Sequence, residues 1–452
     1  MTKVAYDLVV SGTLVLPDRN LPGGWLATCD GKIAAIGNGA PPSATKTYDA
    51  GQDFVLPGAI DGQTHATSCG GLSGFASTTR SAVAGGVTTL VDMPYDNPNP
   101  LTTMELLHAK VDAIETLSFA DVALYATVAP GQDTRALADL AAAGACAIKI
   151  SSMESHPVRF PRVGGNDTLD ILEAAAALKL PVGLHNEDQE IVRGSIAALK
   201  AANRITPEWH EPSRPIAAEL AATANFLALG MATGAHVHLV HVSCPEGFAM
   251  IRAFQQLGVK ATSEMPVHYL HFDAARDISR LGARMKVSPP IRAGVLPQLW
   301  DVMLRDEVEF VSSDHSSWPI EYKMTESIFD AGAGIPGLET LVPSFYSDLV
   351  GKVEQPERVL ASYLGEKPAR FFGLWPQKGS LSTGADADIM VLRTGSFPFD
   401  AKRTHDELNW SPYDGETFAA SVSATFVRGV MAWDGETVTA RQGQGHFIRR
   451  AA

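Results

Sequence analysis

Eight short apolar runs, each ending in polar residues, recur through the middle of this 452-residue chain. Segments rich in alanine and leucine with helical spacing lie between them, for example residues 168–177 and 216–232. Buried strands that alternate with helices form a parallel sheet, and eight such units close into a (β/α)8 barrel. We therefore predict a TIM barrel, a fold of the α/β class. The runs are residues 54–60, 87–94, 120–126, 146–150, 181–185, 236–243, 259–264 and 308–315.

The two ends of the chain have a different pattern. Residues 1–55 and 376–452 hold short alternating strands separated by turn residues. These two sets predict a small β-sandwich domain built from both chain ends, which leaves residues 56–375 for the barrel. Within the barrel, residues 319–342 include a run of alternating alanine and glycine, which predicts a flexible loop over the barrel mouth.

Charge and composition narrow the kind of partner. The net charge is −14, which disfavours nucleic acid and anionic membranes and favours a small polar substrate. The first residues show no basic stretch followed by an apolar one, and no apolar run approaches the length of a membrane span, so we expect a cytoplasmic protein. The four cysteines are scattered without a C-x-x-C pair, which predicts reduced thiols; they are Cys29, Cys69, Cys146 and Cys244.

Five of the apolar runs end in side chains that can bind a metal ion. In a barrel, the carboxyl ends of all strands face the active site, so these side chains should converge. Gln63 and His65 alternate on the first strand and should point the same way. The converging residues are His65, Lys149, His185, His241 and Asp314.

Lys149 is unusual because it lies inside an apolar strand. A buried ammonium is costly unless it is paired or chemically neutralised. Addition of CO2 to its amine would give a carbamate, an anionic group whose two oxygens can bridge two cations. Imidazole and carboxylate ligands suit zinc, and also cobalt, manganese or iron.

The motifs and their order resemble the cyclic amidohydrolase branch of the amidohydrolase superfamily. This branch holds the hydantoinases, dihydropyrimidinases, allantoinases and dihydroorotases, and the resemblance covers nearly the whole chain. The stretches that carry it are Leu56–Asp61, Ala84–Thr89, His241–Ser243, Lys286–Arg292, Ser313–Ser316, Lys378–Gly379 and Gly384–Asp388.

The resemblance implies one or two divalent cations, with zinc expected, and a carboxylated Lys149 that bridges them. His185 and His241 would bind the more exposed cation, and His65 and Asp314 the buried one. Asp314 would also be the general base that activates water and returns the proton to the leaving nitrogen. Ser288 would hold the imide edge of the ring, and the chain would form a homodimer or homotetramer.

The chain departs from the family pattern at three places. Gln63 replaces the first histidine of the first strand and is a poorer metal ligand, so the buried site should be weakened or lost. The residues after His65 are Ala66 and Thr67, so the arginine with which dihydroorotases hold a carboxylate is missing. The tyrosine that dihydropyrimidinases place beyond the bridging lysine is also missing, which leaves Ser152 or Glu154 as the polar contact to substrate.

Two classes of function remain open from the sequence. One is a metal-dependent hydrolase that opens a hydantoin, allantoin, dihydropyrimidine or cyclic imide ring. The other is a non-catalytic relative that keeps the fold for scaffolding or assembly. A chain freed from catalysis has no physical reason to retain the converging side chains, which favours the hydrolase. A deaminase of the same superfamily is disfavoured because it does not need the bridging lysine. The stretches 93–98, 313–316 and 411–415 resemble allantoinases in particular.

Overall fold

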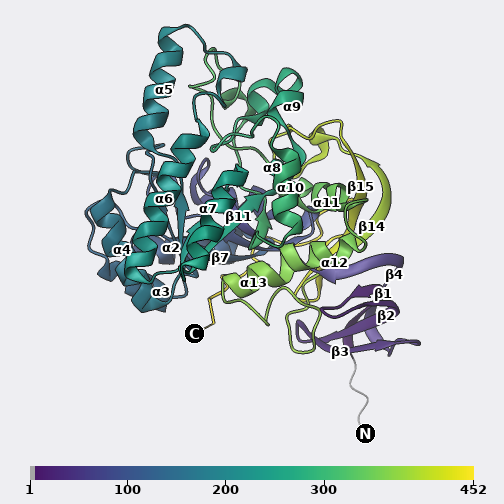
Figure 1. The fold of residues 1–452 in the computed structure, drawn as a ribbon. Helices are drawn as coiled ribbons and strands as arrows, with labels where there is room; N and C mark the ends of the chain where they lie inside the picture. Colours follow the sequence, from purple (N-terminus) through teal and green to yellow (C-terminus); the bar gives the residue numbers. More distant parts are fainter. Residues whose placement is uncertain (1–5, 452) are drawn as a thin grey trace.

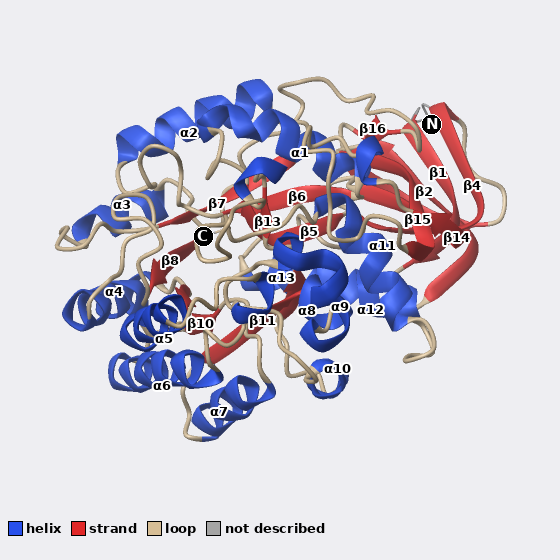
Figure 2. Cartoon of the chain, turned by 90° about the horizontal axis from the view of Figure 1, so that it is seen from above, coloured by secondary structure: helices blue, strands red, loops and turns tan. Residues whose placement is uncertain are grey.

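A parallel sheet forms the centre of the protein in the computed structural model, which describes residues 6–451. Its strands follow the order β12-β11-β10-β9-β8-β7-β6-β5-β13. Each predicted run contributes a strand, and Figure 2 shows helices surrounding these strands. The strands are β5 (Ala59–His65), β6 (Val87–Asp92), β7 (Asp121–Ala126), β8 (Ala147–Ser151), β9 (Val182–His185), β10 (Val237–Leu239), β11 (Ala261–Pro266), β12 (Phe310–Ser312) and β13 (His315–Ser316).

The sheet closes on itself through an interrupted last strand. β12 pairs in parallel with β11, while β13 pairs in parallel with β5. The two pieces are separated by only Ser313 and Asp314, and the latter has a left-handed φ of 49°. They therefore act as two halves of one eighth strand, and the predicted (β/α)8 barrel is confirmed.

Helices cover the outside of the barrel, including the two predicted from their alanine-rich pattern (α4 and α6). The helix α6 has 18 residues and a mean hydropathy of 1.4, enough by length and composition to span a membrane. It belongs to the outer layer, however, where its Glu219 is buried and ion-paired with Arg292 at 2.9 Å. The helices are α1 (Gly74–Ala84), α2 (Met104–Leu117), α3 (Arg135–Ala142), α4 (Gly165–Leu178), α5 (Gln189–Ala201), α6 (Ile216–Thr233), α7 (Pro245–Gln256), α8 (Val267–His271), α9 (Ala274–Leu281), α10 (Leu296–Leu304), α11 (Leu338–Leu349), α12 (Pro356–Ala361) and α13 (Lys367–Phe371).

The first apolar run divides between two strands, which the pattern did not predict. The run continues β4 up to Pro57, and β5 begins at Ala59. Gly58 separates them and lies so close to Thr88 that a Cβ would come within 2.3 Å of its side chain. As a result, residues 61–65 lie inside β5 rather than beyond its end. Gln63 and His65 still alternate with their neighbours and share one face.

The predicted second domain is one continuous seven-stranded sheet of order β16-β15-β14-β4-β1-β2-β3. Strands from the two chain ends meet where β14 pairs antiparallel with β4, and the purple and yellow ribbons lie together in Figure 1. The two halves share a core that includes Val10, Val55, Ile389 and Phe426. The strands are β1 (Tyr6–Val15), β2 (Asn20–Cys29), β3 (Lys32–Asn38), β4 (Ala44–Pro57), β14 (Ile389–Pro398), β15 (Thr417–Val427) and β16 (Val430–Trp433).

Candidate active site

A cavity of about 420 Å³ opens at the carboxyl ends of the barrel strands. It is lined by eight of the nine side chains predicted for the site. Ser152 is the exception, because its hydroxyl is occupied by the main-chain oxygens of His185 (2.7 Å) and Glu187 (2.9 Å). The predicted residues that line the cavity are Gln63, His65, Lys149, Glu154, His185, His241, Ser288 and Asp314.

His185 and His241 face each other across the cavity floor. His185 Nδ1 lies 3.0 Å from His241 Nε2, and both rings are buried. His185 Nε2 contacts Glu187 Oε2 at 2.9 Å, and this carboxylate is in turn held by Arg214. Burial lowers the pKa of both histidines, which favours the neutral form of each ring. A neutral His185 that donates from Nε2 to Glu187 keeps its Nδ1 lone pair for a cation.

Lys149 is buried beside them with 1% of its surface exposed. Within residues 6–451, its amine makes no hydrogen bond or ion pair. Burial lowers the pKa of Lys149 to about 7, and the nearby carboxylates of Glu264 and Asp314 only partly oppose this effect. Burial therefore favours the uncharged amine. An uncharged amine is the form that can add CO2.

Asp314 lies at the break in the eighth strand and contacts the first strand. Gln63 Nε2 donates to Asp314 Oδ1 at 2.8 Å, and His65 Nε2 lies 3.6 Å from the same oxygen. Burial raises the pKa of Asp314 to about 7, against the opposing effects of Lys149 and the Gln63 hydrogen bond. A carboxylate with a pKa near neutrality can both accept and return a proton.

Two acidic residues near these groups were missed by the sequence analysis. Glu264 ends the seventh apolar run and lies near Lys149 and Asp314; burial raises its pKa to about 8. Its position at the end of a barrel strand was the signal that could have identified it. Glu187 follows the fifth run by two residues. Its role depends on the contacts with His185, two residues away, and with Arg214, which lies 27 residues further along the chain and could not be paired with it from the sequence.

The donor atoms present fit a divalent cation. Two imidazole nitrogens converge, the Asp314 carboxylate lines the same cavity, and within residues 6–451 the buried Lys149 amine has no partner. Among residues 6–451, the buried atoms His241 Nδ1, Gln63 Oε1 and Glu264 Oε2 also lack hydrogen-bond partners. Buried polar atoms are usually satisfied, so such a concentration at one site indicates groups arranged for a ligand. Imidazole with carboxylate is a donor set that suits zinc.

Two other groups of acidic side chains lie outside the cavity. Asp121, Asp386 and Asp388 surround the buried Lys378, which forms ion pairs of 2.5, 3.0 and 2.6 Å with them. Their charge is therefore compensated by the protein itself, with Arg428 also bound to Asp121.

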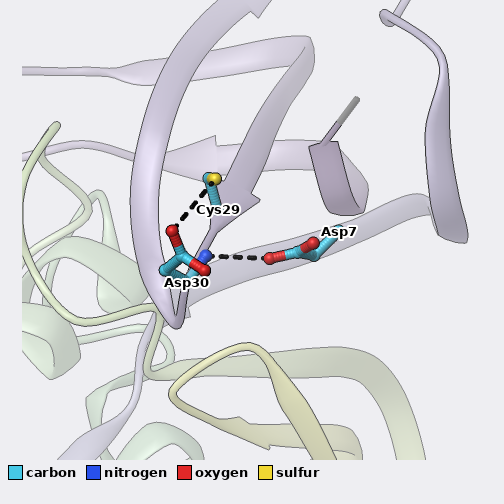
Figure 3. A group of neighbouring side chains, drawn as sticks. All are labelled: Asp7, Cys29 and Asp30. Atoms are coloured by element: carbon cyan, nitrogen blue, oxygen red, sulfur yellow. Dashed lines mark hydrogen bonds between the residues drawn. The ribbon is translucent and has the colours of Figure 1, made fainter. Parts of the chain in front are cut away.

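The second group joins Cys29 and Asp30, at the turn between β2 and β3, to Asp7 on the neighbouring strand β1 (Figure 3). There the main-chain N–H of Asp30 donates to Asp7 at 2.8 Å. Asp30 and Gly31 both have positive φ, which is the geometry of a tight hairpin turn. The hydrogen bond to Asp7 and the turn geometry explain why these three side chains lie together.

A barrel that gathers histidine, lysine and aspartate at the carboxyl ends of its strands has the architecture of an amidohydrolase. Comparison with known proteins narrows this class. The Dihydro-orotase-like family model matches residues 52–247. An allantoinase of Rubrobacter xylanophilus is 34% identical over 451 residues, covering 98% of both chains. An L-hydantoinase of Paenarthrobacter aurescens is 31% identical over 456 residues, with the same coverage.

Solved structures agree with these relatives. The L-hydantoinase (dihydropyrimidinase) from Arthrobacter aurescens has a TM-score of 0.93 and 30% identity, covering 98% of this chain and 100% of that one. A D-hydantoinase structure has a TM-score of 0.91 and 26% identity. The chain therefore belongs to the cyclic amidohydrolases, the branch that includes allantoinases and hydantoinases. It is a hydrolase that acts on carbon–nitrogen bonds in cyclic amides.

Proposed function

We propose that this enzyme opens a hydantoin-type ring in a metal-dependent reaction. The hydantoin ring is the part that allantoin and the substituted hydantoins have in common, and relatives of both kinds match over the full chain. The observation that carries the proposal is the convergence of Lys149, His185, His241 and Asp314 on one cavity. The allantoinase and the L-hydantoinase each match 98% of this chain, which supports the proposal that it shares their class of reaction as well as their fold.

His185 and His241 are the residues that would hold the cation, through the two nitrogens that lie 3.0 Å apart. Lys149, as a carbamate, would add an oxygen ligand, and Glu187 would fix the orientation of His185. When bound, the cation supplies Lewis-acid chemistry, which lowers the pKa of water and polarises the amide carbonyl.

Asp314 moves the proton in this proposal. It accepts a proton from water while the water oxygen bonds to the amide carbon. It then delivers that proton to the ring nitrogen as the carbon–nitrogen bond breaks, leaving an N-carbamoyl amino acid. A pKa raised to about 7 suits both halves of this transfer, because the group is neither too weak a base nor too weak an acid.

Two further polar side chains that line the cavity are candidates for binding the ring of the substrate. Ser288 is half-buried and lines the cavity, so its hydroxyl is our candidate for the imide edge. Glu154 also lines the cavity, although its carboxylate accepts a hydrogen bond of 2.9 Å from Arg193.

Assembly into a homodimer or homotetramer stays a prediction, which light scattering at micromolar concentration can check.

The test is a substrate panel combined with metal analysis. The purified enzyme is assayed on allantoin, 5-substituted hydantoins, dihydrouracil and a cyclic imide, before and after chelation. We expect hydantoin-type rings to be opened fastest, activity to disappear on chelation, and added zinc to restore it. Full activity in metal-free protein would contradict the metal dependence. If the zinc-loaded protein opened dihydrouracil or the imide and not the hydantoins, the proposed ring would be wrong.

A further inference from the structure

Lys323 is a fully buried lysine that has no carboxylate partner among residues 6–451. Its amine donates to three main-chain oxygens, those of Lys286 at 2.8 Å, Gly332 at 2.9 Å and Gly334 at 2.8 Å. An ammonium group has three N–H donors, so three carbonyls satisfy it completely, whereas a neutral amine has only two. Burial lowers the pKa of Lys323, with repulsion from Lys286 adding to this effect. The three carbonyls are the groups that satisfy the buried amine.

A second buried lysine continues the same network. Lys286 donates from its amine to the main-chain oxygens of Ile328 at 2.6 Å and Ala331 at 2.5 Å. Its own carbonyl accepts from Lys323 and also from the N–H of Gly334 at 3.0 Å. The two lysines are thus linked, and together they hold the main chain of residues 328–334 at four carbonyls.

The segment they hold forms a wall of the active-site cavity. Residues 331–334, Ala-Gly-Ala-Gly, all line it, and so does the side chain of Lys286. Such a sequence has almost no side chain to pack and loses much conformational entropy when ordered. This composition led to the expectation of a flexible loop. Four hydrogen bonds from the amines of Lys286 and Lys323 reach this segment, and they are the interactions that can offset that entropy.

We propose that Lys323 and Lys286 are positioning residues that hold residues 328–334 as a rigid wall of the substrate cavity. Neither residue takes part in the proton transfer assigned to Asp314. Their effect on the reaction is to fix the main chain against which the ring and its substituent pack. The kinetic part of this inference rests on the proposed function, whereas the structural part does not.

The first measurement is hydrogen exchange on the whole enzyme, followed in peptides that cover residues 328–336. Lys323→Met keeps the apolar stem and removes all three N–H donors. This variant loses two hydrogen bonds to the segment and one to Lys286, which should speed exchange in the segment at least about tenfold. Lys378→Met is the matched control, because it also removes a buried ammonium but contacts carboxylates outside the cavity. Lys323→Gln retains amide N–H donors and serves in place of Lys323→Met if that variant does not fold.

The second measurement is steady-state kinetics on the best substrate from the panel. Displacement of a cavity wall should lower kcat/KM by about tenfold to a hundredfold, mainly through KM, with the pH profile unchanged. Lys323→Arg, which keeps the charge and N–H donors, should recover part of the loss.

The outcomes separate this inference from the proposed function. Exchange in residues 328–336 that is unchanged in Lys323→Met would overturn the inference. So would a rise in Lys323→Met that is no larger in residues 328–336 than in the rest of the protein, which is the uniform effect expected of general destabilisation in Lys378→Met. Faster exchange without any change in kcat/KM would show that the wall does not position substrate, and would also overturn it. A wild-type enzyme that opens no ring in the panel would refute the proposed function, while the exchange experiment would still decide whether the lysines hold the wall.

Discussion

The amide nitrogen of Gln63 donates a hydrogen bond of 2.8 Å to Oδ1 of Asp314. The residue that stands where the family pattern has its first histidine thus presents a donor to the proposed general base, and its amide nitrogen has no lone pair available for a cation. The amide oxygen is buried and has no partner among residues 6–451. In this arrangement, Gln63 orients Asp314 instead of sharing a cation with it.

The hydrogen bond between Gln63 and Asp314 should limit how many metal ions each chain binds. We expect zinc titration of the wild-type protein to show one tight site per chain, and Gln63→His to raise the content toward two. Asp96 is not free to replace the missing imidazole, because Lys110 holds its carboxylate at 2.6 Å. Loss of one imidazole should cost several kcal/mol of the about 10–16 kcal/mol typical of structural zinc binding. Two equally tight cations in the wild type would contradict the prediction.

Removal of the Lys149 amine should abolish tight metal binding. Lys149→Ala deletes the group that would become the carbamate, and leaves two imidazoles as the main ligands. In protein supplied with 13C-labelled bicarbonate and zinc, we expect a bound carbamate resonance in the NMR spectrum of the wild type and none in Lys149→Ala. Lys286→Ala controls for carbamate at another buried lysine. A wild-type protein with bound zinc and no carbamate signal would refute the assignment.

Glu187 should set the metal affinity of His185 without touching the cation. Glu187→Gln weakens the contact of 2.9 Å with His185 Nε2 and also leaves Arg214 without its charge partner. Loss of such a supporting hydrogen bond should reduce zinc affinity by about 10-fold to 100-fold. Competition with a coloured chelator measures the affinity directly. Glu190→Gln, at an exposed position in α5, is the control and should bind zinc like the wild type.

The buried Lys378 should make stability sensitive to acid. Burial by itself would raise the pKa of Asp121, but the charges of Lys378 and Arg428 outweigh it and hold that pKa below its ordinary value. A depressed carboxyl pKa stabilises the fold above the unfolded pKa of about 4, and this stabilisation is lost as the pH falls through the folded pKa.

Lys378→Met should therefore destabilise the protein by about 3–5 kcal/mol at pH 7, because it leaves buried carboxylates uncompensated. The deficit should shrink as the pH falls toward 4, since protonation removes the uncompensated charges in the variant. Denaturant unfolding of the wild type and of Lys378→Met at several pH values measures this difference in the free energy of unfolding. A deficit that does not depend on pH would show that packing, rather than charge, is lost.

Much of the barrel and its site could be predicted from periodicity. Apolar runs with polar ends locate strands, and parallel strands bring their carboxyl ends to one side. This rule alone was enough to group His65, Lys149, His185, His241 and Asp314. Strand boundaries were harder to predict, because the run 54–60 has the pattern of one strand. The strand pairings show that the chain passes from one sheet to the other at Gly58, which lies close against Thr88.

The amino-acid pattern was sufficient to predict the order of the strands, the residue types at their ends and the family to which the chain belongs. Which atoms face one another depends on the tertiary fold. Gln63 could have offered its oxygen to a cation, yet it donates to Asp314; Ser152 could have reached substrate, yet it binds main-chain oxygens. The alanine- and glycine-rich wall was expected to be flexible because its own side chains cannot order it, and that expectation stays a prediction. The fold adds hydrogen bonds from the amines of Lys286 and Lys323, whose acceptors are main-chain carbonyls and therefore leave no pattern in the sequence.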